Sequence, residues 1–280
     1  MNLFDNVKVM LFAPGNSPNL FEAGKNEGSN GIIIDLEDTI ALADKPQARE
    51  ICFKYLKNTP ASKHFLRGIR INSLKTKAGF EDVLGLIEYE VHPDFIMLAK
   101  TEYAEELLIL DSLFQAHPIL YIALIETTLG IQQIDKISVS SPQLRGFCFG
   151  SGDFATDLSA GSGWEPLLYG RSRLICAASN ARLPAFDAPY LNVKALNHQE
   201  LIEEAQKSKA LGFHGKFAVD PTHVNPIIQV FTPSLEEVAH AQRVMNAYRA
   251  SKGDVCEVDG KMIDVPIARA AEKILAQARK

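Results

Sequence analysis

Residues 119–127 read I-L-Y-I-A-L-I-E-T, an apolar run that stops at Glu126 and Thr127. A short, continuously apolar run is typical of a strand buried on both faces, as the strands of a parallel sheet are. A second run of this kind, G-I-I-I-D-L-E-D, covers residues 31–38 and ends in Glu37 and Asp38. These two stretches predict an α/β fold in which charged groups follow buried parallel strands.

The same pattern recurs along the chain, with helical patterns between the apolar runs. The eight runs are Val7–Ala13, Gly31–Leu36, Leu66–Asn72, Phe95–Ala99, Ile119–Ile125, Gly146–Phe149, Pro184–Ala188 and Gly212–Val219. Eight strands alternating with helices, at spacings of roughly 25–40 residues, predict a (β/α)8 TIM barrel. A doubly wound open sheet is the alternative. That fold is expected to carry a glycine-rich phosphate loop, and no G-x-G-x-x-G or Walker sequence is present.

The pattern changes after Phe231. Ser234 and Glu237 form a capping-box sequence that begins a helix running toward Tyr248. The pair Asp259-Gly260 indicates a tight turn beside a short strand candidate, and a last helix follows it. We therefore predict a barrel domain over residues 1–231 and a C-terminal extension of helices and a hairpin over residues 232–280.

The composition excludes several classes of partner. The 280 residues are 46% hydrophobic and 22% charged, which is ordinary for a globular protein with a sizeable core. The net charge of −5 and the pI near 5.8 argue against nucleic acid and anionic membranes as partners. The apolar runs are too short to span a bilayer, and the first residues lack a targeting pattern. The four scattered cysteines are expected to be buried thiols of a cytoplasmic protein.

Charged residues gather where the predicted strands end, and barrel enzymes place their chemistry there. Carboxylates that face one cavity repel one another, so they need protons or a cation. Mg2+ suits oxygen ligands, and Glu126 and Asp153 follow neighbouring strands as its candidate ligands. Arg70 can then bind a substrate carboxylate or carbonyl oxygen through its planar guanidinium. The other candidate site residues are Pro14, Gly15, Glu37, Asp38, Lys100 and Gly152.

Each of these assignments has a structural alternative. Glu126 and Asp153 could each cap the helix that follows. Arg70 could pair with Asp35 or Glu37, and Asp35 is expected to face the helix layer in a structural role. The residues that could form a plain ion-pair network are Glu37, Asp38, Arg70 and Lys100.

Eight short blocks, in order, resemble the citrate lyase β-subunit family of citryl, malyl and citramalyl thioester lyases, within the HpcH/HpaI-type aldolase superfamily. The blocks lie mainly at the predicted strand ends. They are residues 11–16 (LFAPGN), 35–38 (DLED), 70–72 (RIN), 125–127 (IET), 149–153 (FGSGD), 171–173 (RSR), 212–216 (GFHGK) and 260–264 (GKMID).

The resemblance implies a barrel that assembles as a trimer or hexamer, with Mg2+ on Glu126 and Asp153 and substrate oxygens on Arg70. It also implies that the C-terminal extension packs over a neighbouring subunit's site, where Asp264 transfers a proton. Asp264 could otherwise be the N-cap of the last helix, because Val265-Pro266 follows it. We assign Arg70, Asp264, Glu37 and Asp38 as catalytic, and Arg70, Pro14, Gly15, Lys100 and Gly152 as substrate-binding.

The expected function is a Mg2+-dependent carbon–carbon lyase that cleaves a 3-hydroxyacyl thioester into an acetyl thioester and a keto acid. Many coenzyme A-using members of the family carry arginine in the stretch that matches residues 16–20. Here that stretch reads N-S-P-N-L, so an acyl-carrier thioester is an alternative substrate to a coenzyme A thioester. Further alternatives are a citryl-carrier lyase subunit, a free-acid aldolase, a thioesterase, and a non-catalytic assembly subunit. The choice among glyoxylate, pyruvate and oxaloacetate as the keto acid is also left open.

Overall fold

The computed structural model describes residues 2–192 and 198–278. The chain divides into two compact units, residues 1–228 and residues 229–280. The first unit contains an eight-stranded sheet, and the second contains a two-stranded one.

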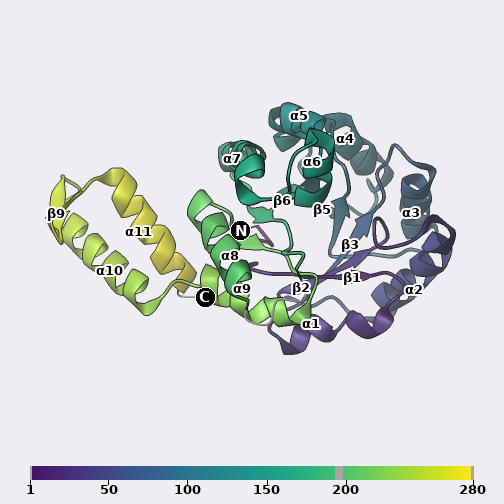
Figure 1. Ribbon diagram of the computed structural model, residues 1–280, viewed down its shortest axis with the longest axis horizontal. Coiled ribbons are helices and arrows are strands. Elements are labelled where there is room, and N and C mark those ends of the chain that lie inside the picture. Colours follow the sequence, from purple (N-terminus) through teal and green to yellow (C-terminus); the bar gives the residue numbers. More distant parts are fainter. Residues whose placement is uncertain (1, 193–197, 279–280) are drawn as a thin grey trace. The chain divides into compact units, whose positions relative to one another are not determined.

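The first unit is a closed parallel barrel with its strands in sequence order, and helices surround the strands (Figure 1). The strands are β1 (Leu11–Pro14), β2 (Gly31–Asp35), β3 (Leu66–Ile71), β4 (Phe95–Leu98), β5 (Leu120–Ile125), β6 (Leu144–Phe149), β7 (Ala185–Asp187) and β8 (Gly215–Lys216). A parallel bridge between Leu11 of β1 and Ala218, two residues after β8, closes the sheet, and the Phe12 N–H donates to the Ala218 carbonyl at 2.7 Å. The (β/α)8 prediction is confirmed, and the closure excludes an open sheet.

Helices follow the strands, with two of them between β6 and β7, and the last helix includes residues 229–231 of the second unit. They are α1 (Ala23–Asn26), α2 (Lys45–Asn58), α3 (Lys77–Glu88), α4 (Ala104–Leu113), α5 (Thr128–Ser138), α6 (Ser151–Leu158), α7 (Trp164–Ala181), α8 (Gln199–Leu211) and α9 (Val224–Phe231). Short 3-10 turns are η1 (Pro18–Leu20), η2 (Leu42–Asp44) and η3 (Pro221–His223). Thr76 and Thr127 begin α3 and α5, and each hydroxyl accepts a backbone N–H three residues on, which pairs a donor that the helix itself leaves unpaired.

Aromatic side chains fill the barrel interior. Phe4 meets Phe95 edge-on with ring centroids 5.1 Å apart, and Phe186 stacks on Phe217 at 4.8 Å. A side chain at Gly68 would place its Cβ 2.1 Å from the Phe95 ring, so only glycine leaves room for that ring between β3 and β4. The interior is therefore packed, and any ligand must bind above it, at the ends of the strands.

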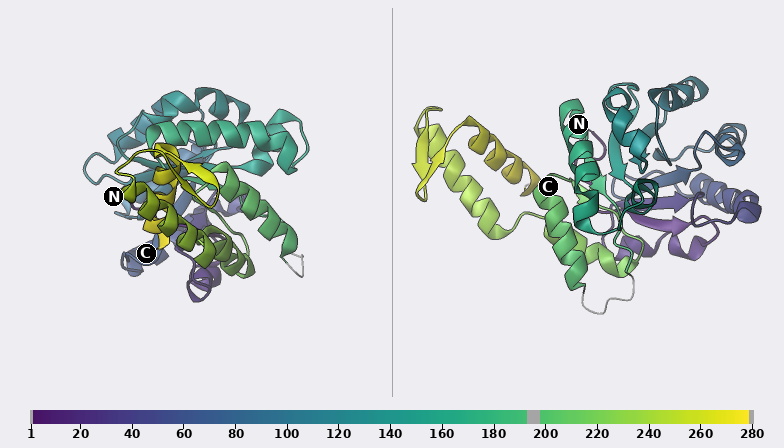
Figure 2. Two further views of the ribbon diagram at one scale, coloured as in Figure 1. Left: turned by 90° about the vertical axis from the view of Figure 1, so that its left-hand side faces the viewer. Right: turned by 45° about the horizontal axis from the view of Figure 1, so that its top comes forward.

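The second unit is a helical hairpin with a β-hairpin at its turn. Its elements are α10 (Leu235–Ala250), β9 (Cys256–Val258), β10 (Lys261–Ile263) and α11 (Val265–Ala278). Both views of Figure 2 show α10 and α11 side by side. Ser234 and Glu237 form the expected capping box. Asp259 and Gly260 both have positive φ, as a type I′ turn requires, so the turn signal correctly located the hairpin.

Two further sequence predictions meet different outcomes. Among the described residues, no helix is both long and apolar enough to cross a membrane. The expectation that all four cysteines are buried is wrong, because Cys176 is exposed and Cys256 is partly exposed, while Cys52 and Cys148 are buried. Cys176 lies on α7, whose outer face meets water, and the helical pattern around it did not separate inner from outer positions.

Candidate active site

Arg70 is anchored by Asp35 across the ends of β2 and β3. The Arg70 Nε and Nη2 atoms donate to the two carboxylate oxygens of Asp35 at 2.6 and 2.7 Å, a bidentate pair. Burial acts to raise the pKa of Asp35, but the hydrogen bonds and charge of Arg70 hold it below its ordinary value. The prediction that Asp35 faces the helix layer is wrong, because its side chain lines the cavity above the barrel. The structural alternative for Arg70, an ion pair with Asp35, is therefore observed.

Two residues that the sequence analysis did not select hold the loop after β2. The Lys45 ammonium donates to the carbonyls of Leu36 and Glu37, both at 2.8 Å. The Asn72 side chain also donates to the Leu36 carbonyl, at 2.9 Å. These bonds fix the backbone that carries Glu37 and Asp38. Lys45 and Asn72 come from separate segments, so no local pattern reveals that they meet.

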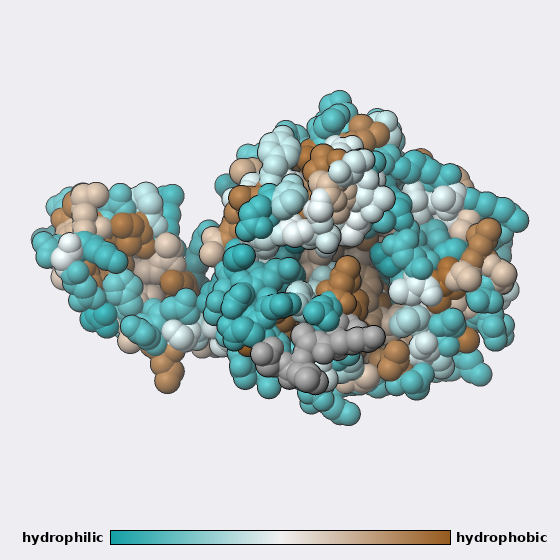
Figure 3. All heavy atoms as spheres, viewed as in Figure 1, coloured by the Kyte–Doolittle hydropathy of each residue, from teal (hydrophilic) through white to brown (hydrophobic). Residues whose placement is uncertain are grey.

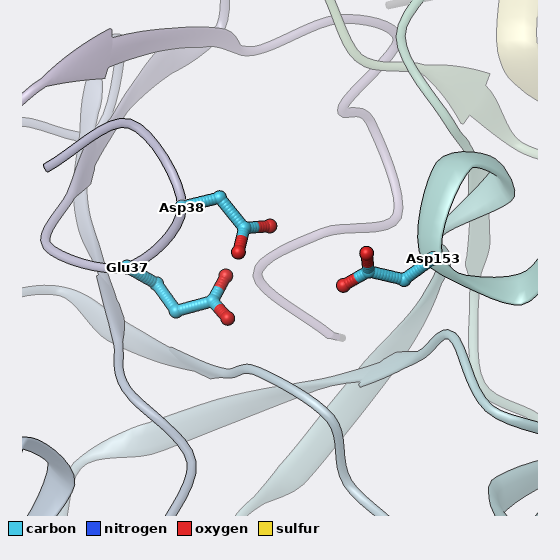
Figure 4. Close-up of side chains that lie close together, drawn as sticks. All are labelled: Glu37, Asp38 and Asp153. Atoms are coloured by element: carbon cyan, nitrogen blue, oxygen red, sulfur yellow. The ribbon is translucent and has the colours of Figure 1, made fainter. Parts of the chain in front are cut away.

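Three carboxylates converge beside this loop. Carboxylate oxygens of Glu37, Asp38 and Asp153 all lie within 4.8 Å of one another. Figure 4 shows the three side chains pointing toward a common space, two from the loop after β2 and one from α6. Burial raises the pKa of Glu37 even though Arg70 and Lys100 counter it. The cluster therefore concentrates negative charge that a cation would stabilise.

Lys100 supplies a positive charge to these carboxylates. Its Nζ lies 2.8 Å from Asp153 and 3.2 Å from Asp38, and it also donates to Glu37. The backbone of Lys100 is left-handed, with φ of 52°, a conformation that is uncommon for a non-glycine residue. The expected network of Glu37, Asp38, Arg70 and Lys100 does form, and Asp153 extends it.

Glu126 follows β5 and is almost fully buried, with 3% of its surface exposed. Its carboxylate accepts the Lys100 N–H at 2.8 Å. Burial raises the pKa of Glu126 to about 8, despite the neighbouring charges of Arg70 and Lys100. The alternative that Glu126 caps the next helix is wrong, because Thr127 is the N-cap of α5. Gly150 matters here, since its Cβ would lie 2.5 Å from the Glu126 carboxylate.

Asp153 is the third residue of α6, whose N-cap is Gly150. Asp153 is therefore not the cap, although its charge suits the positive end of the helix dipole. Its side chain is 37% exposed, in contrast to that of Glu126. The two carboxylates reach the site from the ends of adjacent strands, β5 and β6, as the sequence predicted.

A cavity of about 240 Å3 opens at these strand ends. Its polar side is formed by Asp35, Asp38, Arg70, Glu126 and Asp153, and Gly152 also lines it. A larger groove of about 520 Å3 runs along α2 outside the barrel, but none of the predicted site residues lines it. The larger cavity is therefore not the one around the residues that the sequence analysis selected.

Four of the selected residues, Pro14, Gly15, Glu37 and Lys100, lie near this cavity without lining it. Gly15 has a packing reason to be glycine, because its Cβ would lie 2.9 Å from the Asp35 carbonyl. Glu37 and Lys100 act on the cavity through the ion pairs described above. Pro14 pairs with Asp35 in the β1–β2 register.

Asp264 belongs to the second unit, and the other selected residues belong to the first. Its carboxylate accepts the Ile267 N–H at 3.2 Å, so the N-cap contact expected for the last helix is present. Exposed apolar side chains flank it on β10 and α11, namely Met262, Val265 and Ile267.

The donor set at the strand ends fits a hard divalent cation. It offers carboxylate oxygens and no thiolate or imidazole among the residues that converge, which matches the ligand preference of Mg2+. A buried carboxylate with a raised pKa, Glu126, is a group that a nearby cation would allow to ionise. A closed (β/α)8 barrel with an acidic, arginine-containing cavity at its carboxyl edge is an architecture typical of metal-assisted enzymes.

Comparisons with known proteins place the chain in a family. The HpcH/HpaI aldolase/citrate lyase family matches residues 8–221, and the family of TIM-barrel C–C bond lyases matches residues 165–280. The chain therefore belongs to the HpcH/HpaI aldolase/citrate lyase family.

Individual relatives cover nearly the whole chain. The citrate lyase subunit beta of Haemophilus influenzae is 30% identical over 97% of each chain. An L-malyl-CoA/beta-methylmalyl-CoA lyase of Cereibacter sphaeroides is 28% identical over 97% of this chain and 94% of its own. The structure of CitE from Mycobacterium tuberculosis, in complex with magnesium, acetoacetate and coenzyme A, is 27% identical with a TM-score of 0.83. It covers 99% of this chain and 100% of that one.

Proposed function

We propose that this protein is a Mg2+-dependent lyase that cleaves a 3-hydroxyacyl thioester into an acetyl thioester and a 2-keto acid. The observation that carries the proposal is the convergence of Arg70, Glu126 and Asp153 on one small cavity at the barrel's carboxyl edge. Relatives named as citrate lyase and malyl-CoA lyase, and a neighbour in complex with magnesium and coenzyme A, support the same chemistry.

Glu126 and Asp153 are the proposed Mg2+ ligands. Both line the cavity, whereas Glu37 lies outside it and is engaged by Arg70 and Lys100. Bound there, the ion would supply Lewis-acid stabilisation of negative charge on a substrate oxygen. Asp38 belongs to the acidic cluster and also lines the cavity. We assign Asp38 and Glu37 the role of holding the Arg70 and Lys100 side chains in place through ion pairs.

The proposed reaction breaks the C2–C3 bond of the thioester. The C3 hydroxyl gives its proton to solvent water and becomes the keto oxygen. The electrons of the broken bond remain on C2 as a thioester enolate, which then takes up one proton, so the overall number of protons is unchanged. Arg70, held rigidly by Asp35, is placed to donate hydrogen bonds to substrate oxygens as charge develops. We assign the proton delivery at C2, and its removal in the reverse direction, to Asp264.

The cavity volume indicates which part of the substrate it holds. About 240 Å3 is below the range of roughly 300–1,000 Å3 found for drug-sized ligands, so it suits the hydroxy acid and not an entire coenzyme A thioester. The carrier part of the thioester would therefore extend over the surface. Coenzyme A is the proposed carrier. An acyl-carrier protein is the alternative, because residues 16–20 contain no basic residue.

We further propose that the protein is a homo-oligomer, a trimer or hexamer, in which the C-terminal extension of one subunit covers the site of a neighbour. The exposed Met262, Val265 and Ile267 around Asp264 support this, because apolar side chains grouped on a surface are characteristic of contact sites. In such an arrangement, Asp264 would act in the site of a neighbouring subunit and not in the site of its own barrel.

The ligand assignment is tested with Glu126→Gln and Asp153→Asn. Each is expected to abolish Mg2+-dependent keto-acid release and to weaken Mg2+ binding measured by calorimetry. Asp157→Asn is the matched control, since Asp157 lies one turn further along α6 and bonds Thr128 outside the cavity. Retention of activity in Glu126→Gln together with its loss in Glu37→Gln would move the metal to the Glu37 cluster.

Sharing of the site is tested by mixing two inactive variants, Glu126→Gln and Asp264→Asn, under conditions that exchange subunits. If Asp264 serves a neighbour, mixed oligomers contain sites with both residues intact, and activity reappears. If each subunit uses its own Asp264, the mixture stays inactive. The oligomer size is read from light scattering on the same samples.

A further inference from the structure

The groove outside the barrel follows α2 and reaches Tyr89, the C-cap residue of α3. It shares no lining residue with the cavity at the strand ends. Figure 3 shows hydrophobic surface among hydrophilic side chains on the right of the barrel unit, where Figure 1 places α2 and α3. The groove volume of about 520 Å3 is within the range of roughly 300–1,000 Å3 found for small-molecule sites, so the groove is large enough for a ligand of its own.

Two aromatic rings form one part of this groove. Phe53 on α2 is 5% exposed, whereas Tyr89 is 61% exposed. Their ring centroids lie 6.3 Å apart and their planes are tilted by 46°. Gly85 allows α3 to approach Phe53, because a Cβ at Gly85 would lie 2.7 Å from the Phe53 ring. An exposed tyrosine ring beside a buried phenylalanine offers a flat ligand ring a surface on which to stack.

The rest of the groove is rich in positive charge, although the protein has a net charge of −5. Arg49, Lys54 and Lys57 line it together with one carboxylate, that of Glu50. Lys54 and Lys57 are exposed, and neither forms an ion pair with any residue that the structure describes. They are three residues apart on α2, so their ammonium groups reach the same side of the helix. Two cations placed in this way suit the oxygens of a phosphate group.

A chain of hydrogen bonds leads from the groove to the loop after β2. The Arg49 side chain, 12% exposed, donates through Nε to one oxygen of the fully buried Asp82 at 2.9 Å. The other Asp82 oxygen accepts the Asn72 side-chain amide at 2.6 Å, and that amide also donates to the Leu36 carbonyl at 2.9 Å. Leu36 lies directly before Glu37, so one buried polar network joins the groove to the loop that holds the ion pairs of the site.

We propose that this groove binds a nucleotide and that the bound nucleotide loosens the loop after β2. The base stacks on Tyr89 and Phe53, and the phosphate lies between Lys54 and Lys57. The aromatic part of the groove requires a flat ring, and the two unpaired lysines require an anionic group. A nucleotide carries both in one molecule of suitable size.

Arg49 connects the bound phosphate to the loop. A phosphate at the groove attracts the Arg49 guanidinium and competes with Asp82 for its hydrogen bonds. Asp82 is then less firmly anchored, because a buried carboxylate depends on its cationic partner. The Asn72 amide loses its fixed position in turn, and its hydrogen bond to the Leu36 carbonyl weakens.

Binding is tested by calorimetry of the full-length protein with AMP, in EDTA so that no metal at the strand ends contributes. Tyr89→Ala and Lys54→Glu are each expected to weaken AMP binding by ~10-fold or more, whereas Lys63→Glu, an equal charge change at an exposed residue outside the groove, leaves it unchanged. Adenosine and inorganic phosphate, which each offer one part of the ligand, are expected to bind at least ~10-fold more weakly than AMP. No AMP binding, or binding that neither groove variant weakens, would overturn the proposal. Inorganic phosphate binding as tightly as AMP would do the same.

The effect on the loop is tested by hydrogen exchange of the Glu37 and Thr39 amides, which donate to Asp35 at 2.9 and 3.1 Å. Saturating AMP is expected to raise their exchange rates by ~3-fold or more, and Tyr89→Ala should abolish this response. Arg49→Gln should raise the rates without AMP, because it removes the cation that anchors Asp82. These readouts do not depend on lyase activity. AMP that binds without changing the exchange rates, or an Arg49→Gln variant that exchanges like the wild type, would refute the connection between the groove and the loop.

Discussion

Replacing Glu126 by glutamine should make the metal-free protein more stable, and increasingly so as the pH rises. Burial raises the pKa of Glu126 from its ordinary value of 4.5 to about 8. The folded protein therefore holds a proton that the unfolded chain releases between these two pH values. For a carboxyl group shifted in this direction, folding stability falls as the pH rises from 4.5 to 8 and is constant above that. Glutamine keeps the shape and the hydrogen bond from the Lys100 N–H, but it never ionises.

The size of the effect follows from the same two values. The penalty for ionising Glu126 is about 1 kcal/mol at pH 5 and about 5 kcal/mol at pH 9, so the stability difference between Glu126→Gln and the wild type should grow by about 4 kcal/mol. Urea unfolding in EDTA at pH 5, 7 and 9 measures it. Glu88→Gln, on the exposed end of α3, controls for the loss of one carboxylate. A difference that does not change with pH would mean that Glu126 is ionised in the folded protein at every pH tested, which would refute the reasoning.

Three other substitutions probe the site's support and the core. Gly150→Ala, at an ordinary φ of −103°, places a Cβ 2.5 Å from the Glu126 carboxylate and should weaken Mg2+ binding in calorimetry by about 10–100-fold without unfolding the protein. Lys216→Met leaves the buried Asp187 without one of its cations and should cost about 3–5 kcal/mol in urea unfolding. Phe95→Ala empties the barrel interior next to Phe4 and should lower the unfolding free energy by about 3–5 kcal/mol.

The strands were predictable because each buried parallel strand is an unbroken apolar run. All eight predicted runs contain or overlap an observed strand, and polar residues just after several of them line the cavity at the strand ends. The groups that position these polar residues were less visible. Lys45 holds the loop after β2 from the first turn of α2, and the sequence around it shows only the start of a helix.

The orientation of individual side chains was the other limit of the sequence. Asp35 precedes Leu36 on a strand end, and alternation suggested that it faced outward, yet its pairing with Arg70 places it at the cavity. That pairing depends on the β2–β3 register, in which Asp35 lies opposite Arg70. The Glu126–Gly150 contact likewise depends on β5 and β6 lying side by side, so no local signal marks Gly150.

The most direct test of the lyase function is keto-acid release from malyl- and citramalyl-coenzyme A, measured with Mg2+, after EDTA, and after Mg2+ is restored. We expect one keto acid and one acetyl-coenzyme A for each thioester consumed, with activity lost in EDTA and recovered with Mg2+. Free coenzyme A thiol without keto acid would contradict this function and indicate thioester hydrolysis. So would a protein that binds Mg2+ but releases no keto acid from either substrate.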